Sequence, residues 1–155
     1  MQFTSREDIE AQIEVVFAEV TDVAAFERLV LRRGAELQRT DALAEPGVGM
    51  AWHARVTWRE TPRDVEITLV AYDPPNGVAF DMSSGAITGR LQVDLEALTA
   101  TRTRLNVDLG IAASNLSGRL LLQPVKLMRG DLDRRFRLRV TEFARDIEDR
   151  FKGGA

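Results

Sequence analysis

The 155-residue sequence contains no cysteine and only one histidine, His53. The absence of thiols excludes disulfides, thiolate catalysis and cysteine-ligated zinc or iron–sulfur sites. With a single imidazole, we also expect no transition-metal site built from side chains alone. The sequence therefore predicts a protein without a metal or another cofactor.

Long apolar runs are missing as well. No uncharged segment approaches the roughly 18 residues that a membrane span needs, and residues 1–8 have neither the basic nor the apolar region of a signal peptide. Acidic residues outnumber basic ones by 24 to 21, so the net charge of −3 repels a polyphosphate. We expect a cytoplasmic protein that spans no membrane and binds no nucleic acid.

The composition is that of an ordinary globular protein, with 45% hydrophobic and 29% charged residues. A chain of this length can bury about 68–70% of the surface that it exposes when unfolded, which is enough for one core. We expect a single domain over residues 1–152.

The N-terminal part combines a strand with two short helices. Residues 3–11 predict the strand, and apolar residues then recur at helical spacing from Ile13 to Val20. Asp22 is suited to cap a second helix, which ends at Arg32-Arg33-Gly34, with cations in its last turn and glycine after it.

From residue 35 to residue 111 the pattern changes to alternation of apolar and polar residues. Five sets of alternating apolar residues each face one way along an expected strand. They are Met50, Trp52, Ala54, Val56 and Trp58; Val65, Ile67, Leu69 and Ala71; Val78, Phe80 and Met82; Leu91, Val93 and Leu95; and Leu105, Val107 and Leu109. Short turn-forming segments separate these strands and leave no room for crossover helices. The pattern predicts an antiparallel meander with one apolar and one polar face.

The C-terminal part is helical. Its apolar residues are spaced by three or four and predict a helix of about 30 residues; they are Leu121, Val125, Met128, Leu132, Phe136, Val140, Phe143, Ile147 and Phe151. Pro124 either kinks this helix or marks the junction with an earlier short one. Three pairs at i,i+4 predict ion pairs on its polar side: Asp131–Arg135, Asp133–Arg137 and Asp146–Arg150.

This order of elements resembles the START/SRPBCC superfamily, which includes birch-pollen-allergen-like and polyketide cyclase/dehydrase-like proteins. Framework segments similar to bacterial members are Pro46-Gly47-Val48-Gly49-Met50-Ala51-Trp52, Tyr72-Asp73-Pro74-Pro75 and Leu116-Ser117-Gly118-Arg119-Leu120-Leu121. The resemblance implies an α+β helix-grip fold. In that fold a curved antiparallel sheet of about seven strands has two short helices after its first strand and packs against a long C-terminal helix.

The resemblance also implies a hydrophobic cavity between the sheet and the C-terminal helix. The residues placed to line that cavity, or to fill it as ordinary core, are Met50, Trp52, Trp58, Phe80, Met82, Met128, Leu132 and Phe136. The indole N–H of Trp52 or Trp58 is a candidate polar anchor. Gly47-Val48-Gly49 lacks the context of a dinucleotide loop and predicts a turn, which can lie at the cavity mouth in such a fold.

The sequence predicts no catalytic residue on the inner face of the sheet, because none of the residues expected to face inward has an ionisable side chain. The alternation places His53 on the polar face beside Arg55, unless a register slip or bulge turns it inward. No serine lies in a nucleophile-elbow pattern.

Three functions remain open. The favoured one is a non-catalytic binding or carrier protein for a small hydrophobic molecule such as a lipid, a quinone or a polyketide-like compound. The second is a polyketide cyclase- or dehydratase-type enzyme, which would need a buried titratable group in the cavity. The third is an interaction protein with a filled core, in which no void of roughly 300 Å³ would remain.

Overall fold

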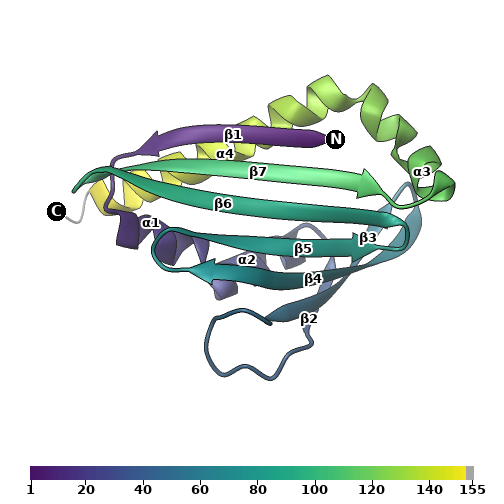
Figure 1. Ribbon diagram of the computed structural model, residues 1–155, viewed down its shortest axis with the longest axis horizontal. Helices are drawn as coiled ribbons and strands as arrows, with labels where there is room; N and C mark the ends of the chain where they lie inside the picture. Colours follow the sequence, from purple (N-terminus) through teal and green to yellow (C-terminus); the bar gives the residue numbers. More distant parts are fainter. Residues whose placement is uncertain (153–155) are drawn as a thin grey trace.

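The computed structural model describes residues 1–152 and shows one antiparallel sheet of seven strands with four helices (Figure 1). The elements in chain order are β1 (Gln2–Ile9), α1 (Ile13–Val20), α2 (Val23–Arg32), β2 (Glu36–Arg39), β3 (Ala51–Trp58), β4 (Thr61–Asp73), β5 (Gly77–Ser84), β6 (Ile87–Thr99), β7 (Arg102–Ala113), α3 (Leu116–Leu127) and α4 (Arg129–Lys152). The strands are ordered β1-β7-β6-β5-β4-β3-β2. The predicted α+β class and meander are confirmed.

Three of the helices, α1, α2 and α4, lie on one face of the sheet, while α3 lies beyond the end of β7 (Figure 1). The predicted N-cap is confirmed, because the Asp22 carboxylate accepts a hydrogen bond of 3.0 Å from the N–H of Ala25. Gly34 follows α2 with a φ of +82°, a left-handed conformation that glycine adopts without strain. The other face of the sheet has no helix over it and carries the polar side chains.

The register of β4 shifts once, between Leu69 and Ala71. Leu69 pairs with Phe80, whereas Ala71 pairs with Ala79, so Val70 is the extra residue of a β-bulge. The prediction that Ala71 faces the core is therefore wrong, since the bulge exposes Ala71 to solvent. Its neighbour Tyr72 turns towards the helices instead.

The C-terminal helical region consists of two helices, as one of the two alternatives for Pro124 predicts, but Pro124 does not mark their junction. Pro124 lies inside α3, and the break comes at Met128, between Leu127 and Arg129. The N–H of Met128 still donates to the carbonyls of Pro124 and Val125, and the N–H of Leu132 then donates to the carbonyl of Met128. The two helices thus meet at a tight junction rather than at a loop.

The ion pairs predicted for α4 are confirmed at two of three positions. Arg135 lies 3.0 Å from Asp131, and Arg137 lies 3.2 Å from Asp133. The third prediction is wrong. Arg150 contacts Asp146 only at its backbone carbonyl, at 3.4 Å. Its guanidinium instead lies 2.9 Å from the carboxylate of Glu19. Arg150 therefore links α4 to α1, because Glu19 offers a charged partner across the helix interface.

The apolar stripe of the C-terminal helices is buried at one end only. Ile147 has no exposed surface and packs in the same cluster as Ile9, Val16 and Leu105. Towards the N-terminus of α4 the burial declines, and Met128 is 49% exposed. The sheet therefore holds α4 tightly near its C-terminal end and loosely near its N-terminal end.

Within residues 1–152, no helix is both long enough and apolar enough to cross a lipid bilayer. The same part of the chain contains no group of three or more histidine, aspartate or glutamate side chains arranged to hold a metal ion.

Because α4 is tightly packed near its C-terminal end, shortening the Ile147 side chain should lower the stability of the fold markedly. Replacement by alanine removes buried methyl and methylene groups and leaves a cavity, so Ile147→Ala should lower the free energy of unfolding by about 2–5 kcal/mol. The measurement is urea unfolding followed by circular dichroism. The matched control is Leu138→Ala on the exposed side of α4, which should change stability by less than about 0.5 kcal/mol. Equal effects of the two substitutions would contradict the proposed anchoring.

Candidate functional site

An apolar cavity of about 350 Å³ lies between the inner face of the sheet and the helices. Its floor consists of alternate residues of β3 to β7, and its other walls come from the α1–α2 connection, from Phe26 of α2 and from α4. The cavity lies where α4 begins to separate from the sheet, and Phe136, Val140 and Phe143 are the α4 residues that face it with their apolar side chains. A straight helix leaves this space because it cannot follow the curved sheet along its whole length.

Aromatic rings form one wall. Trp52 packs edge-to-face against Phe26, with ring centroids 5.4 Å apart, and lies 6.3 Å from Phe80. On the β2 side the guanidinium carbon of Arg39 lies 5.6 Å from the centroid of the Trp52 ring, which is within range of a cation–π interaction. These contacts hold the Trp52 side chain in one position.

The indole nitrogen of Trp52 has no hydrogen-bond partner among the described residues, although it is buried. A buried N–H without an acceptor costs about 1–3 kcal/mol. Most buried donors in proteins are paired, so the indole N–H of Trp52 is an exception in the wall of this cavity.

The cavity has few other polar groups, and two of these are already engaged. The Thr21 hydroxyl donates to the carbonyl of Phe17 at 2.7 Å, and the Asp22 carboxylate caps α2. Arg139 lies at the rim with most of its side chain in solvent, 3.9 Å from Glu142. The cavity is therefore apolar in its body, and its border carries both donors and the partly used carboxylate of Asp22.

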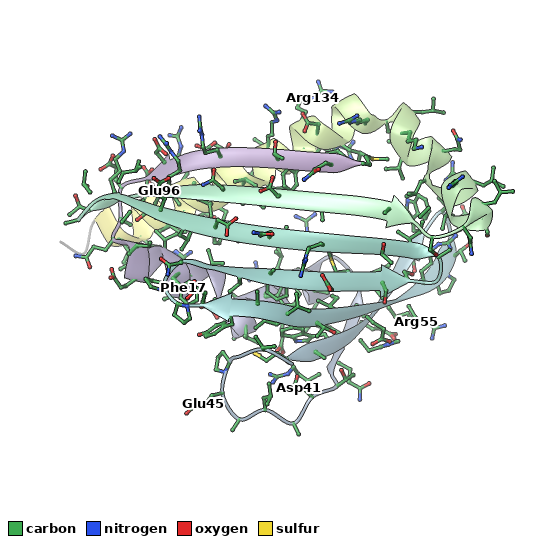
Figure 2. All side chains as sticks on the ribbon, in the orientation of Figure 1. Phe17, Asp41, Glu45, Arg55, Glu96 and Arg134 are labelled. Carbon is green, nitrogen blue, oxygen red and sulfur yellow. The ribbon has the colours of Figure 1, made fainter. Side chains whose placement is uncertain are left out.

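Tyr72 is the cavity residue that alternation missed. The bulge at Val70 turns its ring inward, where it packs edge-to-face on Phe17 at 5.5 Å (Phe17 is labelled in Figure 2). A signal exists in the sequence, because Leu69-Val70-Ala71-Tyr72 is a continuous run in which the alternation of β4 is lost. Tyr72 therefore adds a tyrosine to the cavity lining, which the strict alternation did not provide.

The structure brings five of the eight predicted lining residues together. Met50, Trp52, Phe80, Met82 and Phe136 all contact the cavity. Trp58 does not, because it ends β3 beside the hairpin turn, where the guanidinium carbons of Arg59 and Arg63 lie 5.7 and 5.3 Å from its ring centroid. Met128 and Leu132 also lie outside the cavity lining, because they belong to the junction and to the first turn of α4.

The segment of residues 40–50 borders the cavity through Pro46 and is fastened by Asp41. The Asp41 carboxylate accepts two hydrogen bonds of 2.6 Å from Arg39 and others from the N–H groups of Leu43 and Ala51. Figure 2 labels Asp41 and Glu45 in this segment at the β2 edge of the sheet. The bond from Arg39, followed by that from the Ala51 N–H, holds the pKa of Asp41 far below its usual value.

His53 lies on the outer face of the sheet, as predicted, and not in the cavity. Its Nδ1 is 2.5 Å from Glu66 and its Nε2 is 3.1 Å from Asp64, and these carboxylates, Glu66 first, raise the pKa of the imidazole. All three side chains are well exposed to solvent. The histidine therefore has the surroundings of a surface ion-pair cluster.

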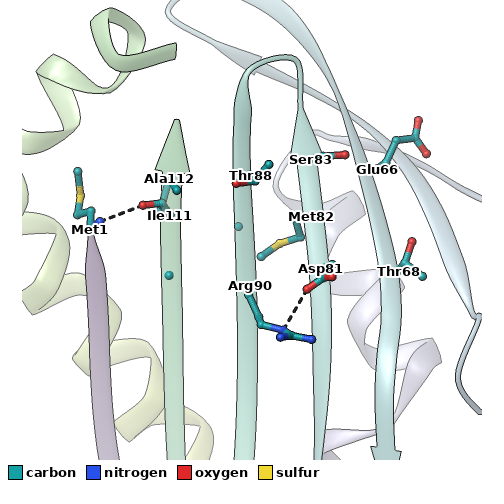
Figure 3. Close-up of a pocket in the computed structure, with 12 residues that line it drawn as sticks. Met1, Glu66, Thr68, Asp81, Met82, Ser83, Thr88, Arg90, Ile111 and Ala112 are labelled. Carbon is teal, nitrogen blue, oxygen red and sulfur yellow. Dashed lines mark hydrogen bonds and ion pairs between the residues drawn. The ribbon is translucent and has the colours of Figure 1, made fainter. Parts of the chain in front are cut away.

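The outer face also has a hollow of about 630 Å³, open to solvent, over the ends of β4 to β7 (Figure 3). It exists because Gly89 and Gly110 have no side chains to cover the strands, and its most prominent contact is the ion pair of Arg90 with Asp81 at 3.1 Å. Although it is larger than the inner cavity, it is more open to solvent, and charged side chains such as Glu66, Asp81 and Arg90 interrupt its apolar surface. The inner cavity is the better candidate for a functional site.

Solved structures share this architecture at low sequence identity. The ZhuI aromatase/cyclase from Streptomyces sp. R1128 is 12% identical, with a TM-score of 0.67 over 97% of this chain and 95% of its own. Norcoclaurine synthase from Thalictrum flavum, a point mutant in complex with a transition-state analogue, is 9% identical, with a TM-score of 0.65 over 97% and 95%. Ara h 8.0201 is 12% identical, with a TM-score of 0.58 over 96% of both chains. The chain has the helix-grip fold.

No family model matches the sequence, and no curated protein matches it either. The likeness to the solved helix-grip proteins is therefore one of fold, as the order of elements predicted. In this helix-grip chain the cavity is the space between the sheet and the gripped helix, with α2 and the residue 40–50 segment along its border.

Asp41 predicts a pH-dependent contribution to stability. A carboxyl with a lowered pKa in the folded state stabilises the fold above its unfolded pKa of about 3.9, and this contribution is lost as the pH falls through the folded value. Asp41→Asn should therefore be less stable than the original chain at pH 7, and the difference should shrink below about pH 4.

Urea unfolding at a series of pH values measures this difference. Glu45→Gln in the same segment is the matched control, because Glu45 is exposed and should leave the unfolding midpoint unchanged. A destabilisation by Asp41→Asn that stayed constant from pH 7 to pH 3 would show that the charge of Asp41 is not the cause.

Proposed function

We propose that residues 1–152 form a single helix-grip domain that binds and carries a small hydrophobic molecule without chemically changing it. The observation that carries this proposal is the cavity of about 350 Å³ with almost entirely aliphatic and aromatic walls. Ligand sites in proteins commonly measure about 300–1,000 Å³ and combine apolar walls with a few convergent polar groups. A volume near the lower end of this range favours a compact ligand, such as a molecule with two or three fused rings.

The same volume argues against a filled core. A side-chain core closes to native packing density and leaves few voids larger than a water molecule. Here large residues such as Phe136 and Phe143 line the cavity and are only partly buried, and their rings leave its centre open. An apolar ligand would bury these rings and recover the lost contacts, at about 25 cal/mol for each Å² removed from water.

The polar groups in the cavity indicate the chemistry of the ligand. The indole of Trp52 and the guanidinium of Arg139 can only donate hydrogen bonds, whereas the phenol of Tyr72 can donate and accept. Asp22 accepts one hydrogen bond, from the N–H of Ala25, and the Thr21 hydroxyl donates to Phe17. A ligand with carbonyl oxygens on an apolar ring system, such as a quinone or an aromatic ketone, matches the donors of this set.

The experiment that identifies the ligand class is native mass spectrometry of the freshly purified protein, followed by solvent extraction. A stoichiometric adduct of an apolar molecule supports the proposal and reveals its class. A clean apo mass, together with flat thermal-shift responses to quinones, lipids and aromatic polyketides, would overturn it.

The unpaired indole predicts a selective effect of Trp52→Phe. Menadione and 2-methylnaphthalene have the same ring system and methyl group, but only menadione carries carbonyl acceptors. Loss of one neutral hydrogen bond costs about 0.5–1.5 kcal/mol, so Trp52→Phe should weaken menadione binding about three- to tenfold and leave 2-methylnaphthalene binding nearly unchanged.

Displacement of a fluorescent apolar probe measures both affinities. Trp58→Phe is the matched control because Trp58 lies outside the cavity, and it should alter neither affinity. A parallel loss for both ligands would show that Trp52 contributes shape rather than a hydrogen bond.

A second candidate function is catalysis on the same ligand, and Tyr72 is the observation that favours it. Two of the structural relatives are named as an aromatase/cyclase and a synthase, so the fold accommodates enzymes. Proton transfer by a positioned side chain contributes about 10²–10⁴-fold to a rate, and Tyr72 is the cavity group that could take part.

Incubation of the extracted molecule with the protein distinguishes the two candidates. For a carrier, the molecule keeps its mass, and Tyr72→Phe changes retention by no more than about tenfold. Conversion to a product, with a rate that falls by about 100-fold or more in Tyr72→Phe, would replace the carrier proposal by the enzyme. Liquid chromatography with mass detection follows both outcomes.

A further inference from the structure

Helix α3 has a second apolar face that packs against nothing in the described chain. Leu116, Leu120 and Leu127 are 69%, 62% and 87% exposed. Their spacing of four and seven residues places them on one side of the helix. Leu127 is followed by Met128, which is 49% exposed at the junction with α4. Isolated exposed leucines are common in proteins, but four neighbouring apolar side chains on one helix and its end form a patch.

The opposite side of α3 already holds the helix in place. Gly118 lies so close to Ala86 and Ala113 that an added Cβ would come within 3.1 Å of both, and Leu122 is buried on the same side. The exposed leucines are therefore not needed to attach α3 to the sheet.

The charges around this patch are opposite to those of the rest of the protein. Residues 116–139 contain seven basic and two acidic side chains, which leaves 14 basic and 22 acidic residues elsewhere in the sequence. Within the described chain, no ion pair joins Arg119, Lys126 or Arg129 to a carboxylate, whereas the arginines further along α4 pair with Asp131 and Asp133. A local charge of about +5 beside an apolar face is complementary to an anionic surface.

The junction of the two helices concentrates both properties. Lys126, Leu127, Met128 and Arg129 follow one another, so two cations enclose the two exposed apolar residues. Long basic side chains can extend their charged ends to lipid headgroups while leucine and methionine enter the layer beneath them. Figure 1 places α3 at one end of the molecule, beyond the end of β7.

We propose that α3 and its junction with α4 dock the protein on the surface of an anionic lipid membrane. The aliphatic patch enters the interface, and Arg119, Lys126 and Arg129 contact the headgroups. A lipid surface fits better than a protein partner, because the patch contains no tryptophan, tyrosine or phenylalanine, the aromatic residues that commonly dominate protein interfaces. The proposal is independent of the cavity and holds whether or not the protein carries a ligand.

Vesicle flotation tests the docking surface directly. The probe is a set of vesicles of phosphatidylcholine with 30% phosphatidylglycerol (roughly the anionic content at which basic segments bind) and a set of phosphatidylcholine alone. We expect binding to the anionic vesicles at low salt, weak binding to the neutral ones, and release as the salt concentration rises.

Two substitution pairs locate the contact. Leu120→Ser with Leu127→Ser should reduce the vesicle affinity at least about tenfold, because each leucine loses its transfer energy into the interface. The control Leu31→Ser, at a leucine on α2 that is 55% exposed, should leave it unchanged. Lys126→Gln with Arg129→Gln should reduce the affinity about tenfold or more, while the control Arg28→Gln on α2 should not.

Circular dichroism and thermal unfolding confirm that each variant is folded. Absence of binding to anionic vesicles at low salt overturns the proposal, as does an equal loss for Leu127→Ser and Leu31→Ser. A dimer in analytical ultracentrifugation that becomes a monomer on Leu127→Ser, without vesicle binding, overturns it in favour of an interface between two copies of the chain.

Discussion

The constraint on which the rest of the structure depends is the one-sided attachment of α4 to the sheet. Ile147 and Ala144 are locked into the cluster formed by β1, α1 and β7, and Arg150 adds an ion pair to Glu19. From this fixed end towards its N-terminus, α4 becomes less buried. The residues that line the gap between α4 and the sheet include large ones such as Phe136 and Phe143, and even these do not fill it. The cavity is thus a consequence of how the helix is held.

The bulge at Val70 is the second determinant, because it decides which chemistry reaches the cavity. Without the bulge, Ala71 would face inward and the walls would have no phenol. With the bulge, Tyr72 packs on Phe17, and the cavity lining contains a tyrosine in addition to Trp52. The outer face shows the opposite arrangement, with His53 enclosed by Glu66 and Asp64 in solvent. One pleated sheet therefore separates a charged exterior from an interior with few polar groups.

The sequence predicted most of the fold because alternation and helical spacing are local properties. The inner faces of β3, β5 and β6 follow the alternation, and five of eight predicted cavity residues lie together. The failures have a different cause. A bulge depends on how β4 pairs with β5, which the β4 sequence alone does not specify. An apolar stripe shows which side of a helix is apolar, but it does not show how far that side lies from the sheet. The stripe therefore predicts Met128 and Leu132 as cavity residues, whereas neither of them lines the cavity. Trp58 has the correct orientation, but it lies beside the hairpin turn.

The proposed docking surface and the cavity occupy the same part of the helical layer for one physical reason. Met128 and Phe136 are eight residues apart, a distance of about 12 Å along a helix. This stretch of α4 has few buried apolar contacts, since the sheet no longer supports it. Because the sheet does not support this stretch, Met128 is exposed at the junction with α3, and the cavity lies between Phe136 and the sheet. Elements with few buried contacts open at the lowest free-energy cost. This half of α4 is therefore the part of the cavity wall that should open at the lowest cost.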